Sequence, residues 1–334
     1  MLQLRYSFII PVYNRPKEIE ELLESFLKLS SNLEYEIVIV EDGSTETSEA
    51  VINNYSKRLN ISYYYKNNSG PGDSRNYGMQ RAKGNYYIIL DSDVILPKHY
   101  LQDVDDYLKQ NFYHCFGGPD AAHESFSDLQ KAINFSMTSF LTTGGIRGGS
   151  KAVKDFQPRS FNLGLSREAF NTTNGFGKIH PGEDPDLILR LWAKHYKTTL
   201  IKNAFVYHKR RISWNKFYKQ VNKFGQVRPI LNMWHPSSKK ITYWFPTFFL
   251  LGFITSLFLL FIGAYQFLFL YSIYFIAIFI SSLLSTKNVK VALMSLVAVC
   301  IQFYGYGVGF FKSTLKLMIS KKSAEAIFPN LFFK

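Results

Sequence analysis

An apolar stretch from Tyr243 to Ser285, which carries no formal charge, constrains the fold of this chain more than any other feature. A helix needs about 20 apolar residues to cross the hydrocarbon core of a bilayer, so this stretch is too long for one span and fits two. Gly263-Ala264-Tyr265-Gln266 marks the expected break. A third apolar segment begins after Lys290 and runs to Phe311. We therefore predict two to three transmembrane helices within residues 243–311.

The charged residues are distributed unevenly around these segments. No Asp or Glu occurs from Leu187 to Ala324, so the formal net charge of +14 belongs mostly to the second half of the chain. Residues 213–242 mix Lys and Arg with aromatic side chains at helical spacing, which is typical of a helix in the membrane interface. We interpret this basic region as facing anionic lipid rather than nucleic acid; the alternative is a surface helix of a soluble domain.

The N-terminal part is expected in the cytosol, attached to a multi-pass anchor in the cell (inner) membrane. Its first apolar run, Ser7–Ile10, is broken at once by Pro11. This run is too short for the apolar region of a signal peptide. Lys and Arg prefer the cytosolic side of a membrane, yet three spans would place the basic tail, residues 312–334, outside. Either the tail breaks this rule, or one segment does not fully cross.

The first half of the chain alternates apolar strand patterns with helical patterns. Such alternation predicts an α/β domain with a mostly parallel sheet covered on both faces. In such sheets, ligands bind beyond the carboxyl ends of the strands. The expected strands are Ser7–Val12, Tyr35–Val40, Ile61–Tyr65 and Tyr86–Leu90, and the expected helices between them are Pro16–Leu29, Thr45–Arg58 and Pro71–Ala82.

Acidic residues follow the last of these strands, in the sequence Asp91-Ser92-Asp93. Residues i and i+2 of an extended segment point to the same side, so the two carboxylates repel each other unless a cation lies between them. Mg²⁺ or Mn²⁺ would remove that repulsion, and each binds through one or two carboxylates together with substrate phosphates. The pattern thus indicates a site for a metal and a diphosphate, although acidic turns after strands are also common.

Four segments occur in a fixed order: SFIIPVYNRP, VEDGST, GPGDSRNYGMQRAKGNYYIILDSD and GFGKIHPGEDPDLILRLW. Together they closely resemble the family 2 glycosyltransferases over roughly residues 6–230. The resemblance implies the GT-A fold, a single nucleotide-binding α/β domain, which we place at residues 1–212. It also implies a nucleoside-diphosphate sugar as donor and a divalent cation, Mn²⁺ or Mg²⁺, as cofactor.

The resemblance assigns the donor-binding residues. Asp42 would contact the nucleotide base or ribose, although Asp-Gly pairs are also ordinary turn-formers. Arg75 would lie near the nucleotide-sugar. Asp93 would bind the metal, with Asp91 contacting ribose or the metal through water. A neutral imidazole of His208 would complete the metal shell. The end of the first strand would pack around the base through Pro11, Val12 and Tyr13.

The resemblance also places an acidic pair, Glu183 and Asp184, toward the acceptor. A sugar hydroxyl must lose its proton as it attacks the anomeric carbon, and Asp184 is the implied general base. Glu183 would bind the acceptor or serve as an alternate base. Both acids stand at an expected helix start, so an ordinary N-cap role is the alternative.

We therefore expect an inverting, metal-dependent transferase that moves one sugar to a hydroxyl of a membrane-associated, lipid-linked acceptor in glycan or polysaccharide biosynthesis. Single transfer is favoured because QVNKFGQVRPIL lacks the Q-x-x-R-W pattern of the processive members. Three alternatives stay open. One is transfer to a polyprenyl phosphate, which needs no general base. Another is a membrane protein that binds sugar nucleotides without turnover. The third is nucleotidyl transfer, which also uses paired acids and a metal but releases diphosphate.

Overall fold

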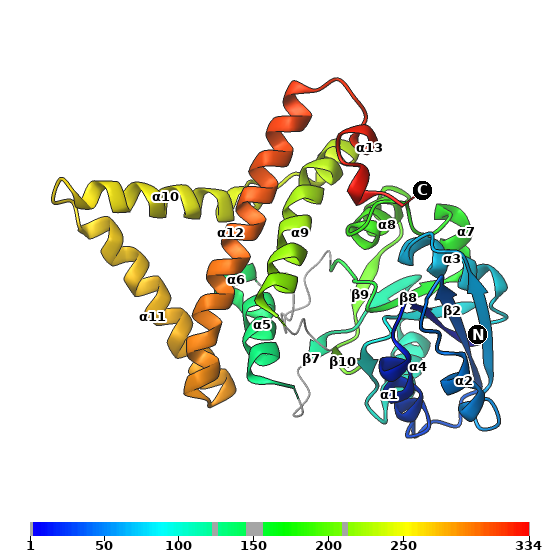
Figure 1. Ribbon diagram of the computed structural model, residues 1–334. Coiled ribbons are helices and arrows are strands. Elements are labelled where there is room, and N and C mark those ends of the chain that lie inside the picture. The colour runs from blue at the N-terminus through cyan, green and yellow to red at the C-terminus, as the bar shows by residue number, and fades with distance from the viewer. Residues whose placement is uncertain (1–2, 122–125, 145–155, 209–212, 334) are drawn as a thin grey trace. The chain divides into compact units, whose positions relative to one another are not determined.

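The computed structural model describes residues 3–121, 126–144, 156–208 and 213–333. The chain forms two compact units. The first comprises Met1–His123, Ser150–Lys209 and Phe332–Lys334, and the second comprises Glu124–Gly149 and Arg210–Leu331. Figure 1 shows the strands in the first unit and the long helices in the second. The predicted organisation, an α/β domain followed by apolar helices, is confirmed.

A seven-stranded sheet, in the order β3-β2-β1-β4-β8-β6-β9, forms the centre of the first unit. Neighbouring strands from β3 to β4 are parallel, and β8 is antiparallel to both of its neighbours. The predicted mostly parallel sheet is therefore confirmed. The strands are β1 (Tyr6–Val12), β2 (Tyr35–Asp42), β3 (Ile61–Lys66), β4 (Tyr86–Leu90), β6 (Cys115–Gly117), β8 (Asn162–Ser166) and β9 (Thr198–Leu200).

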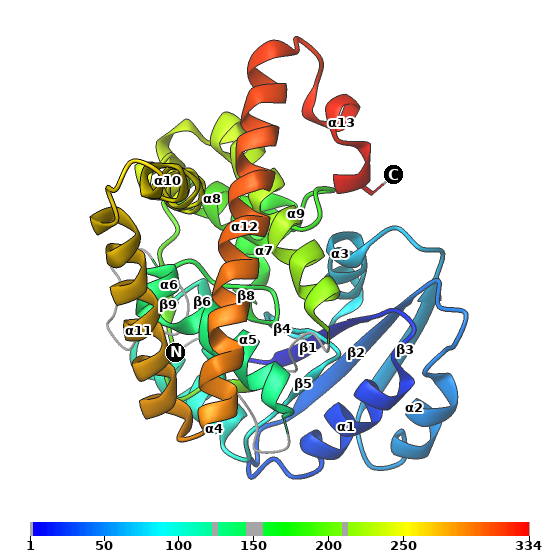
Figure 2. The same cartoon turned by 60° about the vertical axis from the view of Figure 1, so that its left-hand side comes forward.

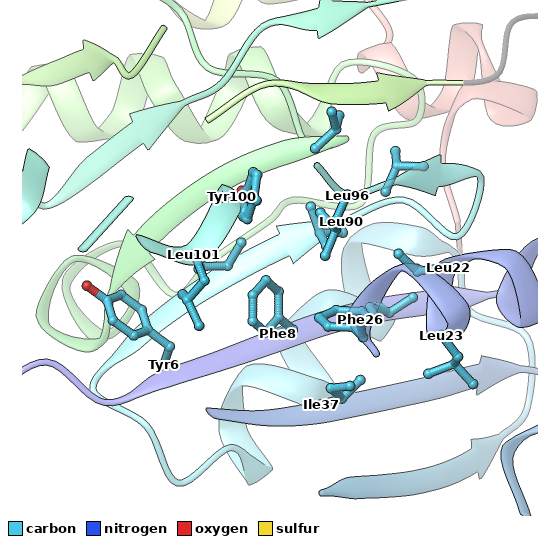
Figure 3. Packing of buried hydrophobic residues seen from close by; sticks show 14 of the residues in the cluster. Tyr6, Phe8, Leu22, Leu23, Phe26, Ile37, Leu90, Leu96, Tyr100 and Leu101 are labelled. Carbon is cyan, nitrogen blue, oxygen red and sulfur yellow. The ribbon is translucent and has the colours of Figure 1, made fainter. Parts of the chain in front are cut away.

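Helices cover both faces of this sheet, because apolar side chains alternate along the central strands. Phe8 and Ile10 of β1 point to one face, and Ile9 points to the other. Figure 3 shows Phe8 packed against Phe26 and Tyr100. The first face is covered by α1 (Pro16–Phe26), α2 (Glu49–Tyr55) and α4 (Tyr100–Gln110), and the second by α3 (Pro71–Arg81), α7 (Arg167–Thr173) and α8 (Glu183–Ala193).

Helix α2 begins at Glu49, four residues later than the pattern predicts. The intervening loop is held by side chains instead of helical hydrogen bonds. Asn14 Oδ1 accepts from the backbone N–H groups of Thr45 and Glu46, and Glu41 Oε2 accepts from that of Ser48. These bonds tie the loop after β2 to the end of β1, at the edge of the sheet where the polar motifs lie.

A second, three-stranded sheet brings distant residues to that edge. It contains β5 (Val94–Ile95), β10 (Val206–His208) and β7 (Asp120–Ala121), in the order β5-β10-β7. In its register, His208 lies opposite Val94. Because Val94 directly follows Asp93, this pairing places His208 beside the acidic motif.

The second unit is helical. Three of its helices are long and apolar enough to cross a membrane: Ile241–Leu260, Gln266–Thr286 and Val289–Ile319. The connection between the first two, residues 261–265, overlaps the predicted break at residues 263–266. The third continues past Phe311 and contains Lys312 and Lys316. The helices of this unit are α5 (Asp128–Thr138), α6 (Phe140–Thr143), α9 (Trp214–Trp234), α10 (Phe245–Leu260), α11 (Gln266–Thr286), α12 (Val289–Ile319) and α13 (Ala324–Ile327), with single 3₁₀ turns at Pro236–Ser238, Ile241–Trp244 and Pro329–Leu331.

Helix α9, predicted as the interfacial helix, packs closely along α12. A Cβ atom at Gly225 would lie 2.2 Å from the carbonyl oxygen of Tyr306, so only glycine allows this approach. Asn222 Nδ2 donates to the carbonyl of Gly305 at 2.9 Å, and Ser313 Oγ donates to that of Gln226 at 2.7 Å. On α9 the lysines Lys216, Lys219 and Lys223 are exposed. The buried apolar side chains of this helix are Phe217, Val221, Val227, Ile230 and Leu231, whereas Met233 and Trp234 at its end are exposed.

Candidate functional site

Each acid of the Asp91-Ser92-Asp93 motif has an arginine partner. Asp91 Oδ1 accepts from Arg75 Nη2 at 2.8 Å, and Asp93 Oδ2 accepts from Arg15 Nη1 at 2.5 Å. Burial raises the pKa of Asp93, but His208 and Arg15 together lower it well below its usual range. The two guanidinium groups therefore place a positive charge against each carboxylate, a role that the sequence pattern assigned to a divalent cation. Arg15 was missed as a site residue, although it directly follows Tyr13-Asn14 at the end of β1.

The three predicted metal ligands lie together. One ligand atom each of Asp91, Asp93 and His208 lies within 4.8 Å of the others. His208 Nε2 is 3.3 Å from Asp93 Oδ1, and Phe161 stacks on the imidazole at 4.8 Å. His208 Nδ1 is buried and has no hydrogen-bond partner in the described part of the chain. Two carboxylates and an imidazole together fit Mn²⁺ well. The carboxylate oxygens also suit Mg²⁺.

Arg75 joins the end of β4 to the start of α8. Its Nη1 donates to Glu183 Oε1 at 2.9 Å while its Nη2 holds Asp91, and the residue is 3% exposed. Burial alone would lower the pKa of Arg75, but Asp91 and Glu183 raise it by more, so the net shift is upward and the guanidinium stays charged. The residue predicted to lie near the donor sugar is thus the centre of a buried ionic network.

Asp42 is buried at the end of β2 and holds the loop that leads into α3. Its Oδ1 accepts from Lys66 Nζ at 2.6 Å and from the N–H of Ser69 at 3.0 Å. Its Oδ2 accepts from the N–H of Gly70 at 2.9 Å. Gly70 has a φ of +95°, which favours glycine. Lys66 was missed by the sequence reasoning, and nucleotide contact by Asp42 stays a prediction.

The other predicted donor residues stand at the end of β1. Val12 is buried, Pro11 is partly buried, and Tyr13 is 51% exposed. Val12 lies opposite Glu41 in the parallel pairing of β1 with β2, one residue before Asp42. The register therefore brings this strand end and Asp42 to the same edge of the sheet, with the ring of Tyr13 accessible to a ligand.

Glu183 and Asp184 have different surroundings at the start of α8. The N-cap residue is Gly182, so the alternative in which the acids cap the helix is wrong. Glu183 is buried between Arg75 and His180, whose Nδ1 lies 3.1 Å from Glu183 Oε2. Burial raises the pKa of Glu183, but His180 and Arg75 lower it by more.

Asp184 is the more accessible acid of the pair. Its side chain is 16% exposed, against 4% for Glu183. Asp184 Oδ2 lies 3.7 Å from Arg159 Nη1 and accepts a long hydrogen bond, 3.4 Å, from the N–H of Ser160. Asp184 is thus more exposed to solvent than Glu183.

The family model described as Glycosyl transferase family 2 matches residues 7–172. The poly(ribitol-phosphate) beta-N-acetylglucosaminyltransferase TarS of Staphylococcus aureus (strain Mu50) is 33% identical over 111 residues, which cover 32% of this chain and 19% of that protein. The poly(ribitol-phosphate) beta-glucosyltransferase of Bacillus spizizenii is 35% identical over 112 residues, 32% of this chain and 18% of that protein. The match thus spans about a fifth of these relatives' length.

Among solved structures, the mannosyltransferase PcManGT from Pyrobaculum calidifontis, in complex with GDP-Man and Mn²⁺, is similar over most of its length. The two share 13% sequence identity with a TM-score of 0.58, over 96% of this chain and 89% of that one. At this identity the likeness shows a common fold, and the predicted GT-A architecture is confirmed.

Proposed function

This chain carries a family 2 glycosyltransferase domain, and from that premise we propose that it is an inverting, metal-dependent glycosyltransferase. It would move one sugar from a nucleoside-diphosphate sugar to a hydroxyl of a membrane-associated, lipid-linked acceptor in glycan or polysaccharide biosynthesis. The observation that carries this proposal is one connected site. Asp91, Asp93 and His208 meet at the sheet edge, and Arg75 links them to Glu183 beside the proposed base.

In the proposed donor site, Asp91, Asp93 and His208 would hold Mn²⁺ or Mg²⁺. The bound metal would offset the negative charge of the departing diphosphate. Arg15, whose guanidinium reaches Asp93, supplies a further positive charge at the same edge. The solved mannosyltransferase of this fold holds GDP-Man and Mn²⁺ together, so the fold accommodates this pair of ligands.

In the proposed acceptor site, Asp184 acts as general base. A single displacement with inversion requires a carboxylate that removes the hydroxyl proton as the oxygen attacks the anomeric carbon. The side chain of Asp184 is partly exposed, whereas that of Glu183 is buried and its two oxygens contact Arg75 and His180. Glu183 therefore holds the start of α8 in place and, through it, the position of Asp184.

The proposed acceptor is held at the membrane. Three helices are long and apolar enough to span it, and α9 exposes lysines beside them, where anionic lipid attracts basic side chains. We place the protein in the cell membrane as a multi-pass chain with its catalytic unit in the cytosol. Relatives named for poly(ribitol-phosphate) glycosylation support an acceptor of the glycan-polymer type.

The donor and the metal can be tested together by thermal unfolding of the full-length protein in detergent. A ligand at 100 times its Kd stabilises a protein by about 2.7 kcal/mol. We expect one class of nucleoside-diphosphate sugar to raise the midpoint only when Mn²⁺ is present. Asp93→Ala should lose this joint effect, and the exposed carboxylate change Asp106→Asn should keep it. If no sugar nucleotide stabilises the wild-type protein and none is consumed, the proposal is wrong.

The base can be tested separately by transfer assays. Asp184→Asn should keep the donor-dependent stabilisation and lose about 10²-fold or more of the transfer rate, within the range typical of a removed general base. A fully active Asp184→Asn protein would contradict the hydroxyl acceptor. It would instead identify a phosphate acceptor such as a polyprenyl phosphate, which is already ionised and needs no base.

A further inference from the structure

The chain returns to its first compact unit after the three apolar helices. Phe332 and Phe333, which we call the C-terminal strap, belong to the unit that contains the sheet. Phe332 forms an antiparallel β-bridge with Ile179, and the N–H of Phe333 donates to the carbonyl of Lys178 at 3.1 Å. The strap therefore rests on the loop that leads into α8.

The ring of Phe333 lies between the two halves of the candidate site. On one side, its centroid is 5.8 Å from that of His180, whose Nδ1 contacts Glu183. On the other side, a Cβ atom at Gly70 would lie 2.3 Å from Phe333 Cδ2, so the ring packs directly on the Gly70 backbone. The N–H of Gly70 in turn donates to Asp42.

We propose that Phe333 is a positioning residue of the transferase: it braces the Lys178–His180 loop and so fixes the start of α8, where Glu183 and Asp184 stand. The kinetic part of this statement rests on the proposed function, whereas docking of the strap does not. A reacting group displaced by about 1 Å can lose about 10²-fold in rate, so a loosened loop would act on turnover more than on donor binding.

The strap also constrains how the chain crosses the membrane. The strap and the sheet share one compact unit and must lie on the same side, so the segments between them make an even number of crossings. With three candidate helices, two cross and one does not. This resolves the conflict between three apolar segments and a basic tail, because the tail then lies on the side of the catalytic unit.

Helix α12 is the segment that we assign to the catalytic side. Its first turn is held by an ion pair of 3.0 Å between Lys290 and Asp128 of α5, a helix that the chain reaches before any candidate span. Its other end leads to the strap. In an apolar 18-residue stretch of α12, 44% is buried, against 11% in the corresponding stretches of Ile241–Leu260 and Gln266–Thr286. Figures 1 and 2 show α12 packed beside α9, with α10 and α11 joined by a turn from which they diverge.

This assignment also agrees with the charges. The connection between α10 and α11 carries no charged residue, as suits a loop on the far side. Six lysines within α12 or close to its ends then lie on the catalytic side, in keeping with the preference of Lys for the cytosol. Lys287 precedes the helix, Lys290, Lys312 and Lys316 lie within it, and Lys321 and Lys322 follow it.

Docking of the strap can be tested without any activity. The hydrogen bond from Phe333 to Lys178 marks Ile179 and Phe332 as a non-hydrogen-bonded antiparallel pair, whose Cα atoms are typically about 4.5 Å apart. That separation suits a disulfide. In a Cys300→Ser background, Ile179→Cys with Phe332→Cys should form an intramolecular disulfide in native membranes under mild oxidation, detected as a linked peptide by mass spectrometry.

The matched control replaces Lys57 instead of Ile179. Lys57 is exposed near the start of β3, at the opposite edge of the sheet from the site, so Lys57→Cys with Phe332→Cys should not cross-link. Protection of the buried Cys115 from thiol reagents verifies that each variant is folded. Failure of the 179–332 pair in a folded protein, or equal cross-linking of the control pair, overturns the docked strap.

The positioning role requires kinetics on proteins that bind donor. Phe333→Ala should lower kcat by about 10- to 100-fold with less than a threefold change in the KM for the donor, and Phe333→Leu should recover most of the loss. Unchanged kcat in Phe333→Ala refutes the positioning role. If wild-type protein transfers no sugar, the proposed function fails, and the cross-link still decides whether the strap docks.

The crossing pattern is tested by labelling single cysteines in intact cells with a membrane-impermeant thiol reagent. Ala264→Cys, in the connection between α10 and α11, should react from outside. Lys57→Cys and Lys322→Cys should both react only after permeabilisation. Labelling of residue 322 from the side opposite to residue 57 overturns the assignment.

Discussion

Replacing Arg75 with methionine removes the guanidinium that joins Asp91 to Glu183 and keeps a side chain of similar length. Both carboxylates lose a charged hydrogen bond, of 2.8 and 2.9 Å. Removal of one partner from a buried ion pair costs about 3–5 kcal/mol, because the other charge stays out of water. The side chain of Asp91 is 31% exposed and recovers part of its solvation, whereas that of Glu183 is 4% exposed and does not. We therefore expect Arg75→Met to lower the free energy of unfolding by about 3 kcal/mol, near the lower end of that range.

The loss can be measured with a thiol-reactive dye on the intact protein in detergent. Cys115 is buried in β6 of the first unit, so in a Cys300→Ser background the dye reports the unfolding of that unit. For a domain of 150–250 residues, 1 kcal/mol shifts the midpoint by about 2–4 °C, so Arg75→Met should lower it by roughly 6–12 °C.

Two control variants make this measurement decisive. Arg81→Met changes an exposed arginine of the same helix, which stacks on Tyr77 at 3.3 Å, and should cost less than about 1 kcal/mol. Arg75→Met combined with Glu183→Gln removes the stranded charge and should recover part of the stability. An Arg75→Met midpoint within about 2 °C of wild type, or a double variant less stable than the single one, would refute this account of the network.

Two further predictions concern pH and helix packing. Because His180 and Arg75 lower the pKa of Glu183, its stabilising effect is present above the ordinary value of 4.5 and is lost as the pH falls through the lower folded value. The difference in unfolding midpoint between wild type and Glu183→Gln, followed by tryptophan fluorescence, should therefore shrink from pH 6 to about pH 3; a growing difference contradicts it. Gly225→Leu should separate α9 from α12, because even its Cβ would lie 2.2 Å from a carbonyl oxygen of α12. In detergent, this substitution should lower the free energy of unfolding by about 1–3 kcal/mol or more. Lys223→Leu, at an exposed position of the same helix, should not.

Local patterns in the sequence determined most of the fold. Strand periodicity predicted β1 to β4 to within two residues, because continuous apolar runs can be satisfied only inside a covered parallel sheet. The length of the uncharged apolar stretch, residues 243–285, predicted two of the apolar helices and the turn between them. The boundary of α2 was missed, because side chains of Asn14 and Glu41 replace its first helical hydrogen bonds.

The order of the motifs also predicted which acids would meet. Asp91 and Asp93 follow one strand, and parallel strands end at a common edge, so Asp42 and these acids had to converge there. His208 could be included only through the family resemblance, because it reaches the site by pairing with Val94 across more than a hundred residues of chain.

Tertiary structure alone decided which cations accompany these acids. Arg15 and Lys66 look like ordinary charged residues in the sequence, and the resemblance that singled out Arg75 specified no partner for it on another element. Folding places Arg15 beside Asp93, Lys66 beside Asp42, and Arg75 between Asp91 and Glu183. Burial is greatest for Arg75, whose side chain is 3% exposed, so low solvation strengthens its pairing most.

The C-terminal strap is the clearest case of what sequence could not specify. Hydropathy measures whether a helix could lie in a bilayer, and α10, α11 and α12 all pass that test. Whether each one crosses depends on where its two ends are held. That is set by contacts such as Lys290 with Asp128 and Phe332 with Ile179, which join residues far apart in the chain. Local composition determines which helices tolerate lipid, whereas only the folded chain fixes the side of the membrane on which their ends lie.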